Sequence, residues 1–189
     1  NDFTLDDAVT EGTWANRFMK SDLEKITPYL LQLQQAGIPV LWRPLHEAAG
    51  KWFWWGNGSA ASYVKLWRTM YDFFKQKGIN NLIWVWTSEG NDAAWYPGDE
   101  YVDIIGSDVY GKDGIAVSAE QMAERFNSLA YRYPTKMISL TECGTVTDIP
   151  AQWKGDAQWS WFMPWYGGTH ATDDWWKAVM NSEDVITRN

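Results

Sequence analysis

Short apolar segments alternate with amphipathic helical segments along most of the chain, and this alternation constrains the fold more than any other feature. Each predicted strand is apolar on both faces, as a sheet covered by helices on both sides requires. Strands that alternate with helices form parallel β/α units with right-handed crossovers. The predicted strands are 38–44, 82–86, 102–110, 137–141 and 159–163. The sequence therefore predicts an α/β protein with a parallel sheet.

The helices are predicted from capping motifs and from apolar residues at helical spacing. A capping box at Ser21 and Glu24 predicts the start of the first helix, and Gly37 predicts its end. The remaining predicted helices are 59–77, one that opens with the capping box Ser118–Gln121, and 173–180. No linker or low-complexity tract interrupts the pattern, so we expect residues 1–189 to form part of one domain.

Polar and aromatic residues follow most of the predicted strands, which favours a (β/α)₈ barrel of the TIM type. In such a barrel the carboxyl ends of the strands form the active face. An open Rossmann-type sheet is the alternative, but no glycine-rich phosphate loop opens a helix. A whole barrel typically needs about 250 residues, and this sequence of 189 residues supplies five strands. We therefore expect an incomplete barrel that contains strands 4–8.

Composition excludes several other classes of function. The chain has 16 Lys and Arg against 24 Asp and Glu, which gives a net charge of −8 and argues against a nucleic acid or an anionic membrane as partner. The sequence contains no apolar run of transmembrane length and no basic segment followed by an apolar one at its start, so we expect neither a transmembrane helix nor a signal peptide in it. The lone Cys143 excludes an internal disulfide, and two histidines are too few for a zinc site. We expect no metal and no cofactor.

Tryptophan is unusually abundant, with 15 residues in the chain. A flat apolar ring with a polar N–H edge suits the C–H face of a sugar. Three tryptophans, Trp52, Trp54 and Trp55, fall within a loop bounded by Gly50 and Gly56. Loops are poor places to bury rings, so we expect some of these rings to face a ligand. An aromatic-rich core, or a small cluster that closes one end of the barrel, is the alternative.

Two carboxylates stand where predicted strands end, Glu47 after the first strand and Glu142 after the fourth. A pair of carboxyl groups across a cleft is what glycoside hydrolysis requires, one as acid and one as nucleophile or base. The spacing alone also fits two glutamates that serve helix dipoles or salt bridges.

The residues at these strand ends resemble family 26 of the glycoside hydrolases, most of which are endo-β-1,4-mannanases. The resemblance starts in Arg-Pro-Leu-His-Glu, residues 43–47, with Trp52 five positions later. It continues through nearly the whole chain in the motifs Trp-Val-Trp at 84–86, Asp-Val-Tyr at 108–110, Thr-Glu-Cys-Gly at 141–144 and Trp-Phe-Met-Pro-Trp at 161–165. It implies strands 4–8 of a retaining (β/α)₈ enzyme.

The resemblance also implies catalytic roles for particular residues. Glu47 would be the general acid/base and Glu142 the nucleophile. His46 would help to orient the catalytic carboxylates, and Tyr110 would hydrogen-bond the nucleophile. Arg43 would lie deeper and pair with a carboxylate, because strand alternation would put Arg43 and Glu47 on one face.

Sugar binding is expected to depend on aromatic residues from the same motifs. Trp52 and Trp165 would stack on sugar rings near the cleavage point, and Trp55 would also bind substrate. Trp165 is preferred to Trp161 because it lies further toward the carboxyl end of its strand. Weaker candidates are Glu89, which could bind sugar hydroxyls or lie in a solvated loop, and Asp108, which could be structural.

The resemblance implies a secreted or periplasmic endo-acting hydrolase that cleaves mannan, glucomannan or galactomannan with retention, and a monomer when full length. Some members of the family cut mixed-linkage glucan or β-1,3-xylan instead. The first three strands of the family barrel are missing from this sequence, so we expect open edges at the first and last strands present. A truncated, non-catalytic carbohydrate-binding remnant is therefore a further alternative.

Overall fold

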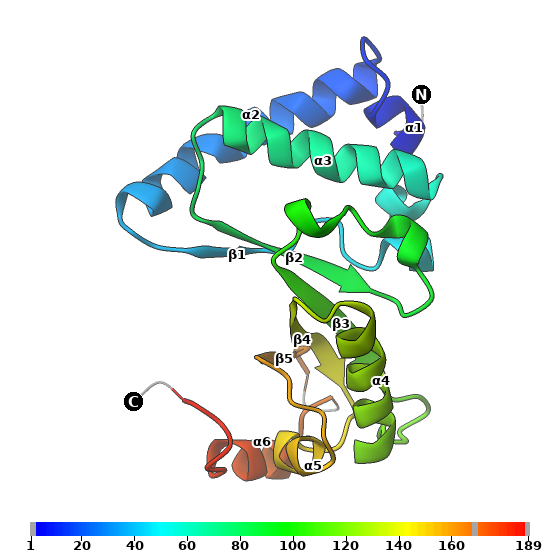
Figure 1. Ribbon diagram of the computed structural model, residues 1–189, viewed down its shortest axis with the longest axis vertical. Coiled ribbons are helices and arrows are strands. Elements are labelled where there is room, and N and C mark those ends of the chain that lie inside the picture. The colour runs from blue at the N-terminus through cyan, green and yellow to red at the C-terminus, as the bar shows by residue number, and fades with distance from the viewer. Residues whose placement is uncertain (1–2, 168–169, 188–189) are drawn as a thin grey trace. The chain divides into compact units, whose positions relative to one another are not determined.

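A computed structural model describes residues 3–167 and 170–187 (Figure 1). The chain divides into two compact units, unit 1 from Asn1 to Ile104 and unit 2 from Ile105 to Asn189. Among the described residues, no helix is long and apolar enough to cross a membrane.

Unit 1 consists of two parallel strands, two long helices and a short N-terminal helix. Its elements are α1 (Leu5–Ala8), α2 (Trp14–Gln35), β1 (Val40–Trp42), α3 (Ala60–Gln76) and β2 (Leu82–Ser88), with 3₁₀ turns at Ala48–Gly50, Trp54–Gly56, Ala93–Trp95 and Asp99–Tyr101. The strands β1 and β2 pair in parallel register from Val40 opposite Leu82 to Trp42 opposite Trp84. The helices α2 and α3 lie side by side (Figure 1). The two strands confirm the predicted β/α alternation, although β1 is shorter than predicted.

The first long helix begins earlier than predicted. Thr13 is the N-cap of α2, and its hydroxyl accepts a hydrogen bond from the backbone N–H of Asn16 at 3.0 Å. The prediction of a start at Ser21 was wrong. The buried residues Ala15, Met19 and Leu23 are spaced four apart, so the buried face of the helix continues toward the N-terminus well before Ser21. The predicted ends are confirmed, since Gly37 after α2 and Gly78 after α3 both have positive φ angles, of 69° and 76°.

Unit 2 contains three strands in the order β3, β4, β5, with three helices. These elements are β3 (Ile104–Tyr110), α4 (Ala119–Arg132), β4 (Met137–Gly144), α5 (Ile149–Lys154), β5 (Phe162–Pro164) and α6 (Asp173–Met180). The predicted capping box of Ser118 and Gln121 is present, and α6 has the predicted bounds. The short helix α5, capped by Asp148, was not predicted.

The core of each unit lies where the helices meet the strands. In unit 1 the residues of α3 that face inward, including Tyr63, Trp67 and Phe74, are almost completely buried. In unit 2 the same holds for Met122 and Leu129 of α4 and for Leu140 of β4. Burial of this apolar stripe against strands that are themselves apolar stabilises each β/α unit. The carboxyl ends of the strands then remain to carry polar side chains.

Candidate active site

The loop after β1 carries the first group of predicted site residues. The strand ends at Trp42, and both Leu45 and Glu47 have a left-handed backbone, each with φ of 53°. The expectation that strand alternation places Arg43 and Glu47 on one face was therefore wrong, because the chain leaves the extended conformation before Glu47. Such a conformation is costly for residues other than glycine, so it persists only where the surroundings hold it.

Two side chains hold this loop by binding its carbonyl groups. The hydroxyl of Tyr63 donates to the carbonyl oxygen of Leu45 at 3.1 Å, and Nε1 of Trp55 donates to that of His46 at 2.7 Å. Burial raises the pKa of the Tyr63 hydroxyl far above its ordinary value, so the hydroxyl remains a donor. The turn that presents Glu47 is thus held by Tyr63 from the core of unit 1 and by Trp55 from within the loop.

The carboxylate of Glu47 contacts the predicted sugar-binding residue Trp52. Nε1 of Trp52 donates to Oε2 of Glu47 at 3.0 Å, while 58% of the Trp52 surface stays exposed. The ring of Trp52 crosses over Gly50 so closely that a Cβ atom there would lie 2.0 Å from ring carbons. Glycine at position 50 is therefore a condition for this placement of Trp52.

The remaining rings of the loop pack mainly on one another. Phe53 and Trp55 are stacked, with ring centroids 4.4 Å apart and planes inclined by 15°. The ring of His46 lies 4.9 Å from that of Phe53, and Trp54 packs edge-on against Phe3 at 4.6 Å. The loop thus combines both expected arrangements, because it forms a small aromatic cluster and still presents Trp52 to solvent.

Arg43 reaches the neighbouring strand end. Its Nη1 donates to Oγ1 of Thr87 in β2 at 3.0 Å. Glu89 follows in the next loop, where its backbone N–H donates to the carboxylate of Asp92. Asp92 is buried and also accepts a hydrogen bond from the hydroxyl of Ser88 at 2.8 Å. The backbone at Glu89 is therefore anchored by a buried carboxylate.

In unit 2 a β-bulge sets the direction of Glu142. The register passes from Leu140 opposite Phe162 to Cys143 opposite Pro164, so β4 advances three residues while β5 advances two. One extra residue in a strand disrupts the ladder locally and re-aims nearby side chains. Glu142 lies within this bulge and is only 4% exposed.

The predicted hydrogen bond between Tyr110 and Glu142 is confirmed. The phenolic hydroxyl of Tyr110 donates to Oε2 of Glu142 at 2.9 Å. Tyr110 is the last residue of β3, and β3 neighbours β4 in the sheet. The hydrogen bond holds the Glu142 carboxylate in one direction at the end of β4.

A second polar pair lies on the same two strands. Oγ1 of Thr141 donates to Oδ1 of Asp108 at 2.6 Å, and the Thr141 side chain sits against Gly106, where a Cβ atom would be 2.5 Å away. The sequence analysis left Asp108 as a weak candidate, although its spacing from Tyr110 already placed both residues on one face of a strand. In the structure, the hydrogen bond from Thr141 holds the Asp108 carboxylate in place.

Cys143 is buried beside these carboxylates and is not an activated nucleophile. Burial, and then the negative charges of Asp108 and Glu142, raise the pKa of the Cys143 thiol to about 12. A thiol with such a pKa stays protonated near neutral pH, whereas the thiolate is the reactive form.

Two further rings lie at the carboxyl ends of these strands. The backbone N–H of Trp165 donates to the carbonyl of Cys143 at 2.8 Å, and the Trp165 side chain is partly exposed. The ring of His170 lies 5.5 Å from that of Tyr110 in an edge-on arrangement. A Cβ atom on Gly144 would lie 2.5 Å from Nδ1 of His170, so glycine is needed there. No sequence signal marked His170 for this place, because it lies in a loop beyond β5.

The structure thus brings together two groups of predicted residues. In unit 1 the loop after β1 gathers Arg43, His46, Glu47, Trp52 and Trp55, and in unit 2 the ends of β3 to β5 gather Tyr110, Glu142 and Trp165.

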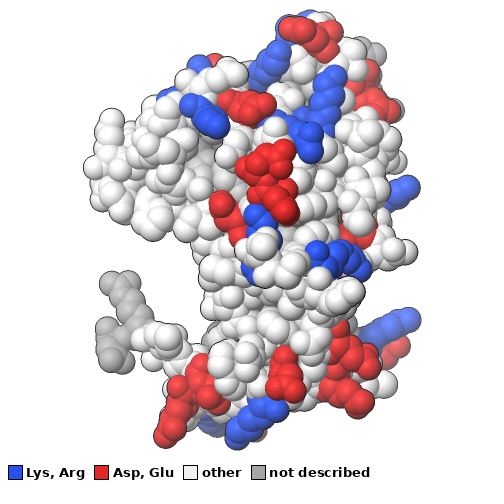
Figure 2. Space-filling model, viewed as in Figure 1, with Lys and Arg blue, Asp and Glu red and all other residues white. Residues whose placement is uncertain are grey.

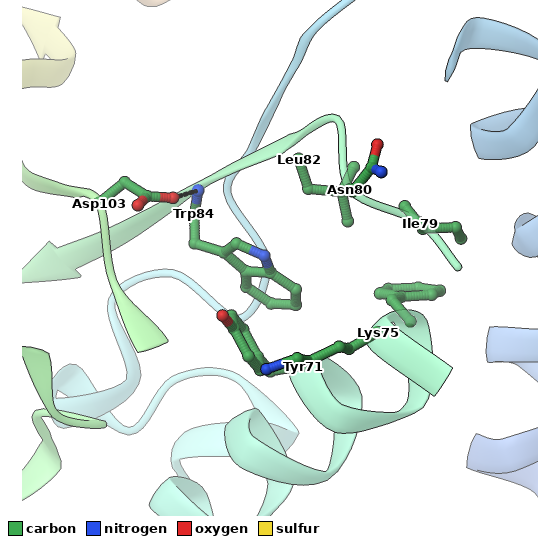
Figure 3. Close-up of a pocket in the computed structure, with 8 residues that line it drawn as sticks. Tyr71, Lys75, Ile79, Asn80, Leu82, Trp84 and Asp103 are labelled. Carbon is green, nitrogen blue, oxygen red and sulfur yellow. Dashed lines mark hydrogen bonds between the residues drawn. The ribbon is translucent and has the colours of Figure 1, made fainter. Parts of the chain in front are cut away.

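A pocket in unit 1 lies at the amino-terminal end of β2, around Leu82 and Trp84 (Figure 3). It has a volume of about 270 Å³ and is lined by Tyr71, Phe74, Lys75, Ile79, Asn80, Leu82, Trp84 and Asp103. Oδ2 of Asp103 accepts the backbone N–H of Trp84 at 2.8 Å, as the dashed line in Figure 3 marks. None of the predicted site residues lines it. In a barrel, the amino-terminal ends of the strands typically serve stability, whereas the catalytic residues lie at the carboxyl ends.

Comparisons with known proteins give the family. Residues 2–188 match the sequence model of glycosyl hydrolase family 26. The chain is 38% identical to mannan endo-1,4-beta-mannosidase A of Piromyces sp, in an alignment of 190 positions that covers 97% of this chain and 30% of the relative. It is 37% identical to a mannan endo-1,4-beta-mannosidase of Thermothelomyces thermophilus, in an alignment of 195 positions that covers 98% of this chain and 39% of the relative. The chain therefore spans less than half the length of these curated relatives.

A solved structure confirms the fold class. The family 26 domain of an endo-beta-mannanase/endo-beta-glucanase from Prevotella bryantii is 43% identical to this chain, with a TM-score of 0.92, and the match covers 98% of this chain and 62% of that domain. The predicted partial (β/α)₈ barrel of five parallel strands is thus confirmed. With a family match over nearly its whole length and this close likeness in structure, the chain belongs to glycosyl hydrolase family 26.

Proposed function

We propose that this chain is part of a retaining endo-β-1,4-mannanase that cleaves mannan, glucomannan or galactomannan by double displacement. The observation that carries the proposal is the buried Glu142 with the Tyr110 hydroxyl on its carboxylate. A nucleophilic carboxylate must be fixed in direction, and the bulge in β4 together with this hydrogen bond supplies that condition. The relatives that support the substrate class are named as mannanases.

In the first step Glu142 attacks the anomeric carbon, while Glu47 donates its proton to the glycosidic oxygen. The bond between C1 and that oxygen breaks, and an ester forms between Glu142 and the sugar. In the second step Glu47 takes a proton from water, the resulting hydroxide attacks C1, and Glu142 leaves as a carboxylate. Trp52 supports the role of Glu47, because its N–H contacts the carboxylate while its exposed face is available to a sugar ring.

The experiment is hydrolysis of galactomannan and glucomannan by this chain, beside Glu47→Ala, Glu142→Ala and the control Glu124→Ala. Glu124 is an exposed carboxylate on α4 with no proposed role. We expect release of reducing ends by the unmodified chain and by the control, and loss of release in the other two variants. Retardation in a mannan-containing gel without any release of reducing ends would instead favour the non-catalytic binding remnant.

A second candidate substrate is β-glucan. In an alignment of 98 positions that covers 45% of this chain and 11% of the relative, the chain is 33% identical to endoglucanase H of Acetivibrio thermocellus. Parallel assays on mixed-linkage glucan and β-1,3-xylan test this candidate and the xylanase alternative. Faster cleavage of either polymer than of glucomannan would replace mannan as the substrate.

We also propose that the protein acts outside the cytoplasm, in the medium or the periplasm, since polymeric mannan does not enter the cytoplasm. Measurement of activity in the medium, periplasmic and cytoplasmic fractions of the producing organism tests this. Activity confined to the cytoplasm would contradict it.

A further inference from the structure

A buried series of hydrogen bonds connects the core of unit 1 to the turn that carries Glu47. The hydroxyl of Tyr63, in the first turn of α3, donates to the carbonyl oxygen of Leu45 at 3.1 Å. The indole N–H of Trp86, in β2, donates in turn to the oxygen of this hydroxyl. Tyr63 and Trp86 are each only 1% exposed, so water has little access to these groups. The series therefore runs from β2 through α3 to the loop after β1.

The chemistry of the three groups determines the direction of each hydrogen bond. An indole N–H donates and does not accept, whereas a carbonyl oxygen accepts and does not donate. The Tyr63 hydroxyl contacts one group of each kind, so it accepts from Trp86 and donates to Leu45. Burial raises the pKa of this hydroxyl far above its ordinary value, the hydrogen bond from Trp86 lowers the pKa in part, and the negative charge of Asp92 raises it further. The hydroxyl therefore keeps its proton for the carbonyl of Leu45.

Asp92 differs from most charged residues of the chain because it is buried. Lys, Arg, Asp and Glu side chains are spread over the face of the molecule in Figure 2, whereas Asp92 is only 2% exposed. A buried carboxylate needs hydrogen-bond donors. The hydroxyl of Ser88 and the backbone N–H of Glu89 both donate to Asp92. These two hydrogen bonds hold the negative charge of Asp92 where it acts on the Tyr63 hydroxyl.

The turn at the end of this series has a backbone conformation that needs support. Leu45 and Glu47 both have φ of 53°, which is costly for residues with a Cβ atom. The Tyr63 hydroxyl binds the carbonyl of the first of these residues. The turn closes at Glu47, because the backbone N–H of Gly50 donates to the Glu47 carbonyl at 3.1 Å. A change in the backbone at Leu45 should therefore move Glu47, which lies two residues further on.

We propose that Tyr63 is a positioning residue for the general acid/base Glu47, and that Trp86 acts through Tyr63 by orienting its hydroxyl. This role rests on the proposed function, in which Glu47 donates a proton to the leaving group. A general acid must lie within hydrogen-bond reach of the atom that it protonates. A displacement of about 1 Å, caused far from the reacting atoms, costs roughly 100-fold in rate. Loss of the Tyr63 hydroxyl should therefore weaken proton transfer and leave attack by the nucleophile unaffected.

The test compares Tyr63→Phe with the unmodified chain on two substrates whose leaving groups differ in their need for a proton. On galactomannan, kcat/KM should fall by roughly tenfold, because Trp55 still holds the carbonyl of His46 and limits the displacement. On dinitrophenyl β-mannobioside, whose leaving group departs without a proton, kcat/KM should change less than about twofold. A loss of folded protein would lower both values equally. Trp86→Phe keeps the hydroxyl but not the donor that orients it, and should show the same pattern with a smaller fall.

The matched control is Tyr71→Phe, on a partly buried tyrosine about two turns further along α3, whose ring packs against other rings of unit 1. It should leave both kcat/KM values unchanged. Hydrogen exchange of the Gly50 amide reports on the turn without requiring activity, because this amide donates to the carbonyl of Glu47. Tyr63→Phe should speed this exchange by roughly tenfold or more, and Tyr71→Phe should leave it unchanged.

Failure of this positioning role and failure of the proposed function give different results. An equal fall of kcat/KM on both substrates, or an unchanged kcat/KM on galactomannan, would overturn the role of Tyr63. Failure of the proposed function would show instead as no hydrolysis by the unmodified chain, or as full activity of Glu47→Ala on galactomannan. Exchange at Gly50 would then still decide the matter for Tyr63, because an unchanged rate in Tyr63→Phe would mean that its hydroxyl does not hold the turn.

Discussion

The two proposed catalytic glutamates are held in opposite ways. Glu47 lies in a loop, on a left-handed backbone, and its carboxylate contacts a tryptophan that is largely exposed. Glu142 lies in a bulged strand, is almost completely buried, and accepts a hydrogen bond from Tyr110. The first setting tolerates adjustment, whereas the second fixes one orientation.

The difference fits the two proposed roles. A general acid/base gains and loses a proton in each cycle and must serve first the leaving group and then water. A nucleophile must meet C1 of each new substrate in the same orientation and as a carboxylate. We infer that rigidity is concentrated around Glu142, and that access is concentrated around Glu47. The effects expected from this comparison are largest for the carboxylates themselves and decrease toward their neighbours.

Removal of either carboxylate should have the largest effect on kcat. The effect of removing Glu47 should also depend on the leaving group of the substrate. Glu142→Ala should lower kcat by roughly 10⁴-fold or more on every substrate, because the covalent step needs the nucleophile. Glu47→Ala should lower it by roughly 10²–10⁴-fold on polysaccharide. With a dinitrophenyl mannoside the first step of Glu47→Ala should be nearly unimpaired, since this leaving group departs without a proton.

Azide identifies the two roles independently of rate. With azide and an activated substrate, Glu142→Ala should give the α-mannosyl azide by direct displacement, and Glu47→Ala should give the β-anomer through the glycosyl-enzyme. Nuclear magnetic resonance of the products distinguishes them. The reverse assignment of anomers would exchange the roles of Glu47 and Glu142.

Tyr110→Phe removes the hydroxyl that contacts Glu142 and keeps the ring. A hydrogen bond to a charged group is worth about 1.5–3 kcal/mol, so kcat should fall by roughly 10- to 150-fold. KM should change little, because the hydroxyl acts on Glu142. The matched control is Tyr131→Phe, on an exposed tyrosine of α4. A KM increase with unchanged kcat would assign Tyr110 to substrate binding instead.

Around Glu47 we expect smaller effects. Trp52→Phe retains an aromatic face but removes the N–H that contacts the carboxylate, and should lower kcat only a few-fold, because the pair is exposed. Gly50→Ala should raise KM, since its Cβ would displace the Trp52 ring. Gly155→Ala, where the nearest atom lies 3.3 Å from the added Cβ, is the control. An effect of Trp52→Phe as large as that of Tyr110→Phe would contradict the contrast between the two settings.

The smallest effect reports the charge of Glu142 through its neighbour. Burial and then the charges of Asp108 and Glu142 raise the pKa of Cys143 to about 12, so Glu142→Gln should lower this pKa while burial keeps it above the ordinary value of 9.0. Alkylation of Cys143 at pH 8–10 should therefore become modestly faster. An unchanged rate would argue that Glu142 carries no charge there.

Stability should follow the same pKa. Because the folded-state pKa of Cys143 lies above 9.0, the protonated thiol contributes stability that is fully present below pH 9 and is lost as the pH rises toward 12. Cys143→Ser retains a small polar group with no titration in that range. The variant should therefore lose less stability between pH 9 and pH 11 in urea unfolding. An equal loss would assign the alkaline decline to other groups.

Much of the fold could be predicted because its signals are local. The capping box at Ser118 and the helical spacing of α3 and α6 each lie within one element, and the structure confirms them. The start of α2 was missed because Ser21 and Glu24 imitate a cap inside a helix that Thr13 had already begun.

One contact within the candidate site could be predicted from the resemblance to the family, but the geometry of the loop at Glu47 could not. The order of motifs along the chain led to the contact of Tyr110 with Glu142, which is confirmed. The left-handed backbone at Glu47 was not predictable, since the loop is held by Tyr63 of α3 and by Trp55, which lies eight residues further along the loop. The place of His170 beside Tyr110 depends on a loop that returns to the strand ends, and no local pattern encodes that return.

The bulge in β4 decides which face of the sheet each of the following side chains points to. One residue beyond the regular count lies between Leu140 and Cys143, and side chains alternate faces at every step. A deletion of a single residue there would restore an even ladder with β5 and could leave every apolar residue before it in place. It would also turn the carboxylate away from Tyr110. Such a chain would keep its sheet but would misdirect the proposed nucleophile, so the proposed reaction depends on the number of residues in β4 as well as on their identity.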